Sequence, residues 1–343
     1  MRILIIGGSG RFIGARVVDE LAGLGHQIGV FARPGAAVRG GVRRFVGDRR
    51  RISDHAAELR AFAPEVVVDV ILGSEAHARA LVDTFRGVAQ RIVAISSMDV
   101  YRSCGVLHRL EPGPLEPLPL TEASPLRTRL QTYPPAQIAM LQHLFGWLDQ
   151  EYDKIPVERA LLADKALPAT VLRLPMVYGP GDKLHRFFPL LKRMDDGRAA
   201  ILMAEDLAAW RGTKGYVNDV AAAIAAATVS DRAAGRIYNV GEANVRTELE
   251  WARAVATITG WRGNLVTLPM ENMPAHLQTP ANFQQHWVAD TTRIREETGF
   301  SERVDRDEAL RRTIEWERAN PPADINLNQF DYAAEDAVIA SRT

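Results

Sequence analysis

The glycine-rich stretch GGSGRFIG, residues 7–14, constrains the fold of this chain more than any other feature. It follows directly on the short apolar run RILII, and it precedes a segment whose apolar residues recur at helical spacing, Val17, Val18, Leu21 and Leu24. A second apolar run, QIGVFA, comes next, so the order predicts a strand–turn–helix–strand unit. In such a unit Gly7, Gly10 and Gly14 let the backbone approach a pyrophosphate at the helix N-terminus.

Further segments follow at the spacing of an α/β protein. RRFVGD, EVVVDVIL and RIVAISS predict strands, SDHAAELRAFAP predicts a helix capped by Ser53 or Asp54, and ARALVDTFRG predicts another helix. The near-continuous Val and Ile runs are typical of strands buried on both faces of a parallel sheet. Ligands bind at the carboxyl ends of such strands, where this chain has Asp48, Leu72, Ser96 and Ser97.

Composition excludes several classes of protein. Lys plus Arg equals Asp plus Glu at 42 each, so no net charge attracts nucleic acid or a membrane surface. The single Cys104 and the eight histidines offer no disulfide and no metal-ligand spacing, and we expect no metal site. No apolar run is long enough for a membrane span or a signal peptide, so we expect a cytoplasmic protein.

An ordered series of motifs is similar to the extended short-chain dehydrogenase/reductase family, the NAD(P)-dependent epimerases, dehydratases and reductases. The resemblance covers roughly residues 1 to 320 and rests on GGSGRFIG, GD, SSMDVY, RLPMVYGPGD, GYVNDVAAAI, YNVGE and EALRRTIEWERANPP. It implies a Rossmann-like doubly wound parallel sheet with a smaller, partly interleaved C-terminal substrate domain. It also implies hydride transfer between a nicotinamide and a substrate carbon, on a nucleotide sugar or another secondary alcohol or ketone.

The resemblance also implies roles for single residues. Asp48 would contact the adenine, Ser97 the reacting oxygen, and Lys154 the nicotinamide ribose, while Pro175 would line the nicotinamide pocket. The end of the fourth strand at Leu72 would lie along the cofactor. The glycine turn departs from the usual spacing because Arg11 adds a residue before Phe12, Ile13 and Gly14.

Charge near the second strand bears on the choice of cofactor. Arg33 ends that strand, Arg11 lies in the glycine turn, and VFARPGAAV contains no acidic residue. Because a guanidinium binds a 2′-phosphate in two places, the sequence favours NADP, with NAD as the alternative. In the opposing interpretation both arginines are solvated loop charges.

The expected proton donor is displaced in this chain. The family pattern is YxxxK with a glutamate four residues later; Lys154 and Glu158 fit it, which leaves Gln150 at the tyrosine position. On a regular helix Tyr152 would face away from Lys154. If the helix instead begins after a cap at Asp153, Tyr152 precedes it and could reach Ser97. The expected catalytic residues are therefore Ser97, Tyr152 and Lys154, with Lys154 lowering the pKa of the phenol.

The resemblance also implies domain boundaries. Residues 1–182 are mainly the dinucleotide-binding domain, with an inserted proline-rich loop and helix at about 105–149, and 183–320 are mainly the substrate domain. The predicted inserted helix carries one apolar face and could act as a lid, as a homodimer contact or as core packing. That face consists of Ile138, Leu141, Phe145 and Leu148. Residues 321–343 are an arm or a disordered tail, with Phe330, Tyr332 and Ile339 as anchors.

A second class of function is a nucleotide-binding protein without turnover. GGSGRFIG also resembles the turn of chloroplast stem-loop RNA-binding relatives, and loss of the tyrosine suits such a role. Six arginines surround the third strand, but few aromatic residues lie between them, so we expect a solvated edge and no nucleic-acid partner. They are Arg39, Arg43, Arg44, Arg49, Arg50 and Arg51.

Overall fold

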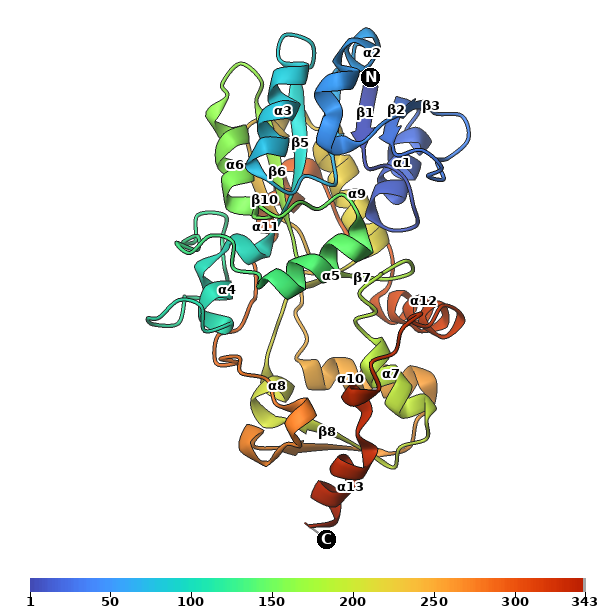
Figure 1. Ribbon diagram of the computed structural model, residues 1–343, viewed down its shortest axis with the longest axis vertical. Helices are drawn as coiled ribbons and strands as arrows, with labels where there is room; N and C mark the ends of the chain where they lie inside the picture. The colour runs from blue at the N-terminus through green and yellow to red at the C-terminus, as the bar shows by residue number, and fades with distance from the viewer. Residues whose placement is uncertain (342–343) are drawn as a thin grey trace.

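A seven-stranded parallel sheet forms the upper half of the protein (Figure 1), for which the computed structural model describes residues 1–341. The strand order β10-β6-β5-β4-β1-β2-β3 reverses between β1 and β4, which confirms the predicted Rossmann-like doubly wound fold. The strands are β1 Arg2–Ile6, β2 Gln27–Ala32, β3 Arg43–Val46, β4 Val66–Asp69, β5 Arg91–Ser97, β6 Ala169–Leu174 and β10 Ile237–Asn239.

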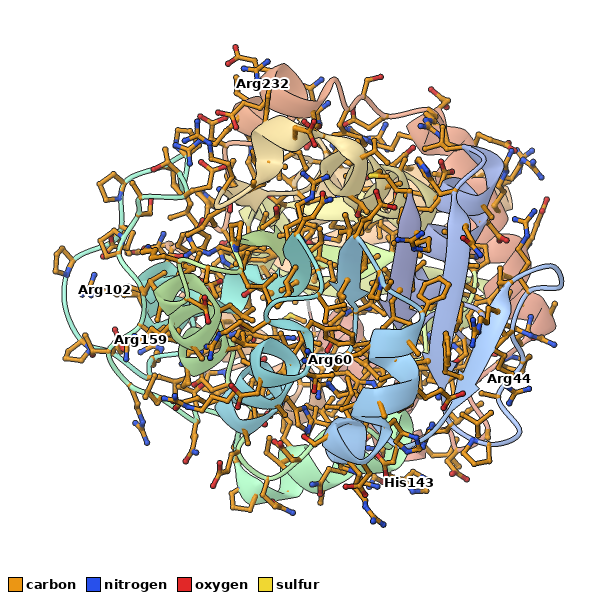
Figure 2. The ribbon with its side chains drawn as sticks, turned by 90° about the horizontal axis from the view of Figure 1, so that it is seen from above. Arg44, Arg60, Arg102, His143, Arg159 and Arg232 are labelled. Atoms are coloured by element: carbon orange, nitrogen blue, oxygen red, sulfur yellow. The ribbon has the colours of Figure 1, made fainter. Side chains whose placement is uncertain are left out.

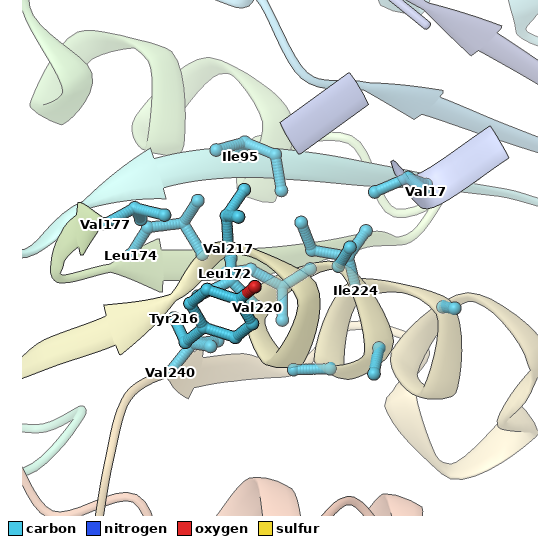
Figure 3. Close-up of a cluster of buried hydrophobic side chains, with 14 of the residues drawn as sticks. Val17, Ile95, Leu172, Leu174, Val177, Tyr216, Val217, Val220, Ile224 and Val240 are labelled. Atoms are coloured by element: carbon cyan, nitrogen blue, oxygen red, sulfur yellow. The ribbon is translucent and has the colours of Figure 1, made fainter. Parts of the chain in front are cut away.

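Helices cover both faces of this sheet. Along β1, Ile3 and Ile5 face one hydrophobic cluster while Leu4 and Ile6 face another, because successive strand residues point to opposite sides. The first cluster packs under α1 (Ile13–Gly23) and α9 (Val217–Val229), as Figure 3 shows. The second packs under α2 (Ala56–Ala61), α3 (Glu75–Phe85) and α6 (Lys154–Ala163).

The lower half is smaller and built largely from the C-terminal part of the chain (Figure 1). Its strands pair as β7–β9 and β8–β11, and the sequence passes back to the large sheet through α9 and β10 before returning. Such a path is interleaved, and the proposed division at residue 182 stays a prediction. The elements are β7 Met176–Tyr178, α7 Phe188–Asp195, β8 Ala200–Ala204, α8 Glu205–Ala209, β9 Lys214–Tyr216, α10 Glu248–Thr259, β11 Asn264–Leu268, α11 Thr292–Thr298 and α12 Arg306–Ala319.

Short 3-10 helices complete the structure, and one of them corrects a prediction. We expected Ser53 or Asp54 to cap a helix, but the backbone turns earlier, because the Asp48 carboxylate accepts a hydrogen bond from the Arg50 backbone N–H at 2.9 Å. The 3-10 helices are η1 Arg49–His55, η2 Met98–Val100, η3 Asp231–Ala233, η4 Met270–Asn272, η5 Ala275–Leu277 and η6 Leu327–Phe330.

The inserted segment between β5 and α6 crosses the middle of the molecule. It contains α4 (Arg102–Leu107), a long loop and α5 (Pro135–Phe145), which lies between the large sheet and the lower half in Figure 1. Gly146 ends α5 with a φ of 67°, a left-handed conformation that favours glycine. Leu148 therefore lies beyond the helix, and the predicted apolar face is shorter than expected, although Ile138 and Leu148 are both buried.

The C-terminal segment is an ordered arm over the residues that the structure describes. Its helix α13 (Tyr332–Ala340) packs on the lower half. The three expected anchors all make contacts there: Phe330 lies under the Arg193 guanidinium, the Tyr332 hydroxyl donates to Asp196 at 2.5 Å, and Ile339 packs on a core cluster. Within residues 1–341 we find no helix with the length and hydrophobicity of a membrane span.

Candidate functional site

A cavity of about 680 Å³ opens at the carboxyl ends of β1, β2 and β4, where the strand order reverses. Most residues expected at the cofactor line it, so the structure brings together segments far apart in the sequence. They are Gly7, Gly10, Arg11, Phe12, Ile13, Gly14, Arg33 and Asp48.

The glycine turn has the geometry of a phosphate cradle. Gly7 and Gly10 have φ angles of 84° and 89°, which side chains disfavour. A Cβ on Gly14 would overlap the carbonyl oxygen of Gly7, so helix α1 packs directly on the turn. Because α1 begins at Ile13, its free backbone N–H groups face the cavity, and these residues fit the pyrophosphate of a dinucleotide.

Two arginines stand near the end of β2. Arg44 donates to the backbone oxygen of Arg33 at 3.4 Å, while an added Cβ at Gly146 would lie 2.6 Å from Arg33 Nη1. Asp48, the acidic group of this region, is paired with Arg50 at 2.6 Å, and the Arg50 hydrogen bond lowers the pKa of its carboxyl. This end of the cavity therefore presents a guanidinium more readily than a free carboxylate.

Residues that the sequence did not point to cover the cavity. The inserted segment contributes Phe145 and Trp147, and the end of α12 contributes Trp316, Asn320 and Pro321. The loop after β7 also lines the cavity, and the GPGD of the resembled motif could have indicated this. Its lining residues are Gly181, Asp182, Lys183, Leu184, His185 and Arg186. The end of α12 lies within EALRRTIEWERANPP, another motif of the resemblance, but its approach to the cavity depends on the path of the whole lower half.

Lys154 begins α6, as the hypothesis of a cap at Asp153 requires. Asp153 accepts from the Ile155 backbone N–H at 2.9 Å, and Pro156 takes the third helical position. The Lys154 ammonium donates to the backbone oxygens of Leu72 and, at 3.0 Å, Ile95. Burial lowers its pKa to about 8. The side chain of Leu72 lies in the core, so only its carbonyl reaches the site.

Tyr152 precedes α6 and lies beside Lys154. Lys154 Nζ is 5.6 Å from the centre of the Tyr152 ring, and that ring also contacts Tyr133 and Trp147, with centroids 5.6 and 6.5 Å apart. Burial first, and then the charge of Asp99, raise the pKa of Tyr152 well above its usual value. We expected Lys154 to lower the pKa of Tyr152, but the surroundings of Tyr152 raise it.

Gln150 lies outside this group. Its side chain is exposed and donates to Gln142 Oε1 at 3.0 Å, so it faces the inserted helix. The position that carries tyrosine in the resembled pattern thus contributes no group to the site.

Ser97 ends β5 at the same edge. Its Oγ accepts from the Asp99 backbone N–H at 3.3 Å, and the carboxylate of Asp99 accepts from the Tyr133 hydroxyl at 2.8 Å. Burial raises the pKa of Asp99. Sequence analysis missed both residues, although Asp99 stands in SSMDVY two positions after Ser97.

Pro175 and Cys104 are not among the residues that line the cavity, and neither are Leu72, Ser97, Tyr152 and Lys154. Pro175 joins β6 to β7, and a Cβ on Gly215 would lie 3.2 Å from its Cγ. Cys104 is buried, and burial raises the pKa of its thiol, which opposes a thiolate mechanism. In the described part of the chain no group of three His, Cys, Asp or Glu residues could hold a metal ion.

The arginines around β3 are mostly occupied. Four form ion pairs with aspartates, Arg39–Asp19, Arg49–Asp69, Arg50–Asp48 and Arg51–Asp54. Arg43 lies over the Phe45 ring at 5.0 Å. Figure 2 shows Arg44 at the β3 edge, across the molecule from Arg102 and Arg159. Paired charges of this kind disfavour an RNA-binding platform.

Comparison with known proteins gives one family. The model of the NAD dependent epimerase/dehydratase family matches residues 3–241. A UDP-N-acetyl-alpha-D-glucosaminuronate decarboxylase from Bacillus cytotoxicus is 27% identical over 161 residues, 45% of this chain and 47% of that protein. The chain thus spans about half the length of this curated relative.

Solved structures of low identity share the fold. UDP-glucose 4-epimerase from Thermotoga maritima, with UDP-glucose, has a TM-score of 0.64 at 19% identity, covering 93% of this chain and 99% of its own. dTDP-glucose 4,6-dehydratase from Bacillus anthracis, in complex with NAD, has a TM-score of 0.65 at 17% identity, covering 93% and 97%.

Proposed function

The chain belongs to the NAD dependent epimerase/dehydratase family, and from this premise we propose that it is an NAD(P)-dependent epimerase, dehydratase or reductase. Its substrate is a nucleotide-activated sugar or another secondary alcohol or ketone. The observation that carries this proposal is the cavity of about 680 Å³ at the reversal of the sheet, lined by Gly7 and residues 9–14 of the glycine turn. The cytoplasmic location and a homodimeric state stay predictions from the sequence.

The substrate class is supported by proteins of similar sequence or structure. Proteins similar to the chain act on or bind UDP- and dTDP-linked sugars, according to their names. A dinucleotide in the cavity would accept or donate a hydride at its nicotinamide. Ser97 would then hold the reacting oxygen, and Lys154 would hold the ribose with its remaining N–H group while keeping its bonds to Leu72 and Ile95.

The proton exchanged with the substrate oxygen requires a phenol near Lys154. Tyr152 is the candidate from the sequence, and its ring lies 5.6 Å from Lys154 Nζ. A loss of roughly 100- to 10,000-fold in turnover is the usual cost of removing such a group, which makes a Tyr-to-Phe change a sensitive test.

NADP is the proposed cofactor because Arg33 lines the cavity at the end of β2 while Asp48 is paired with Arg50. We expect the Arg33→Asp variant to bind NADPH about 10- to 100-fold more weakly and to prefer NADH, because a charge-assisted bond is replaced by repulsion. Calorimetric titration of both nucleotides at fixed salt measures this. Arg159→Asp, an exposed change on α6, is the control. Equal affinities of the parent for NADPH and NADH would contradict the assignment.

Nucleotide binding without turnover is the second candidate, favoured by the exposed Gln150 at the tyrosine position. The two functions differ in a direct assay. Incubation with UDP-glucose, UDP-glucuronic acid and dTDP-glucose plus NADP⁺ or NAD⁺, followed by product analysis, detects an enzyme. Absence of any product, together with an RNA affinity that Arg43→Ala with Arg44→Ala abolishes, would favour the binding protein.

A further inference from the structure

The inserted segment carries a tyrosine into the region where the family pattern has lost one. We infer that Tyr133 exchanges the substrate proton and that Asp99 takes up the proton Tyr133 releases. This inference rests on the proposed function and differs from it in one point, the identity of the phenol. Tyr133 is then a catalytic residue, and Asp99, which acts through it, is a positioning and proton-accepting residue.

Three polar groups meet just beyond β5. The Tyr133 hydroxyl donates to Asp99 Oδ2 at 2.8 Å, and Ser97 Oγ accepts from the Asp99 backbone N–H at 3.3 Å. Asp99 is only 7% exposed, and its other oxygen, Oδ1, is buried without a hydrogen-bond partner within residues 1–341. A buried carboxylate with an unused oxygen is costly to maintain, which points to a function in chemistry rather than in folding.

The two tyrosines differ in what their hydroxyl groups can do. Tyr133 and Tyr152 pack with ring centroids 5.6 Å apart, and Tyr152 alone lies over Lys154. The Tyr133 hydroxyl already points at a proton acceptor, whereas the Tyr152 hydroxyl makes no hydrogen bond to any residue between 1 and 341. A phenol that relays a proton needs such an acceptor, so Tyr133 fits the role better.

Several buried contacts fix the segment that carries Tyr133. Arg127 donates to the Asp99 carbonyl at 2.5 Å and forms an ion pair with Asp153 at 3.4 Å. Asp153 also accepts from the Gln131 backbone N–H at 2.7 Å. Glu111 accepts from the backbone N–H groups of residues 128 and 129 at 2.6 and 2.7 Å. Asp153 also caps α6, so one side chain connects the insert to the helix of Lys154. Such support keeps a reacting group in place.

The proposed step balances as follows for oxidation of a secondary alcohol. The substrate O–H bond breaks and its proton passes to the Tyr133 oxygen, whose own proton moves to Asp99 Oδ2. As the C=O bond forms, the C–H bond breaks with its electron pair, and a dinucleotide bound in the cavity would accept this pair as hydride. Burial raises the pKa of Asp99, and the Asp99 charge raises that of Tyr133, so the carboxylate is a stronger base than a solvated one.

The test compares Tyr133→Phe with Tyr152→Phe on the nucleotide sugar that the parent converts among UDP-glucose, UDP-glucuronic acid and dTDP-glucose. We expect Tyr133→Phe to lower kcat by roughly 100- to 10,000-fold, with KM and NADPH affinity unchanged, and Tyr152→Phe to stay within about threefold. Tyr332→Phe is the matched control, because the Tyr332 hydroxyl also donates to an aspartate, Asp196, on the distant arm.

Asp99 is tested through Tyr133. Asp99→Asn should lower kcat in the parent but cost little more in the Tyr133→Phe background, because its effect passes through the phenol, and Asp99→Glu should recover part of the rate. If Tyr152→Phe abolishes turnover while Tyr133→Phe does not, the inference is wrong and the proposed function stands. If the parent binds NADPH but converts none of the three sugars and none of a panel of other secondary alcohols and ketones, both the proposed function and this inference are rejected.

Discussion

Lys154 holds its ammonium group in the buried space between the ends of β4 and β5. Its pKa is lowered by burial to about 8 from an ordinary 10.5, because burial removes the water that the charge would otherwise bind, and the two carbonyls replace it only in part. Below about pH 8 the native protein bears the full cost of this buried charge. The cost also explains why a lysine would persist here only for a ligand that uses its remaining N–H group.

The pH dependence of stability tests this burial in the protein without cofactor. Between pH 8 and 10.5 the unfolded chain retains a proton that native Lys154 has released, so its contribution to the free energy of unfolding rises with pH, by at most about 3 kcal/mol. Urea unfolding of the parent and of Lys154→Met, at pH values on either side of 8, should differ in slope across this window. Parallel curves would show that Lys154 is solvated.

At the residue scale, the sequence places a residue well where it follows a strand closely. The glycine turn, Arg33 and Asp48 could be placed at the cavity because each follows a strand within a few residues. Tyr133 and Asp99 could not be paired, since 34 residues and a long insert separate them. Hydrogen bonds of Arg127, Asp153 and Glu111, which no local pattern reveals, hold the returning insert in place.

At the element scale, the contact between helix α1 and the turn after β1 is the closest approach at the site. A methyl group on Gly14 would overlap the Gly7 carbonyl. We expect Gly14→Ala to lower the free energy of unfolding by about 1–3 kcal/mol and to weaken NADPH binding at least about tenfold, because the helix must move away from the turn.

Gly23 is the matched control on the same helix. It has no atom within 4 Å of an added Cβ, so Gly23→Ala should stabilise the protein by about 0.4–1 kcal/mol and leave NADPH affinity unchanged. Urea unfolding and calorimetry measure both quantities. Similar effects of the two alanines would mean that the close packing at Gly14 is not needed.

The strands and most helices could be predicted because their hydrophobic period is local. The first turn after β3 could not be predicted, because Asp48 caps a 3-10 helix that begins before the expected start of the helix at Ser53 or Asp54. The end of α5 was also missed, because a left-handed glycine at 146 outweighed an apolar pattern that continued to Leu148.

At the scale of the whole molecule, the C-terminal arm is held by a buried ion pair. Glu335, with 0% exposure, accepts from Arg193 at 2.7 Å and lies 3.1 Å from His276 Nε2. We expect Glu335→Gln to lower the free energy of unfolding by about 3–5 kcal/mol, because it leaves the Arg193 guanidinium buried without its counter-charge.

Asp336→Asn offers the comparison. Asp336 pairs with Arg198 but its side chain is 61% exposed, so its loss should destabilise the protein far less than Glu335→Gln. Thermal unfolding of both variants, with limited proteolysis of the arm, measures the difference. Equal destabilisation would show that the arm is not anchored through Glu335.

The walls of the cavity come from segments that are far apart in the chain and fastened to one another. Lys183 donates to the Leu144 carbonyl at 2.7 Å, and His185 Nδ1 lies 2.6 Å from Glu317 Oε2. Because these contacts hold the lining segments in place, we expect a dinucleotide bound in the cavity to dissociate slowly compared with turnover. A cofactor retained in this way must be regenerated in place, which favours reactions that return it to its starting oxidation state within each cycle, such as epimerisation or dehydration, over net reduction.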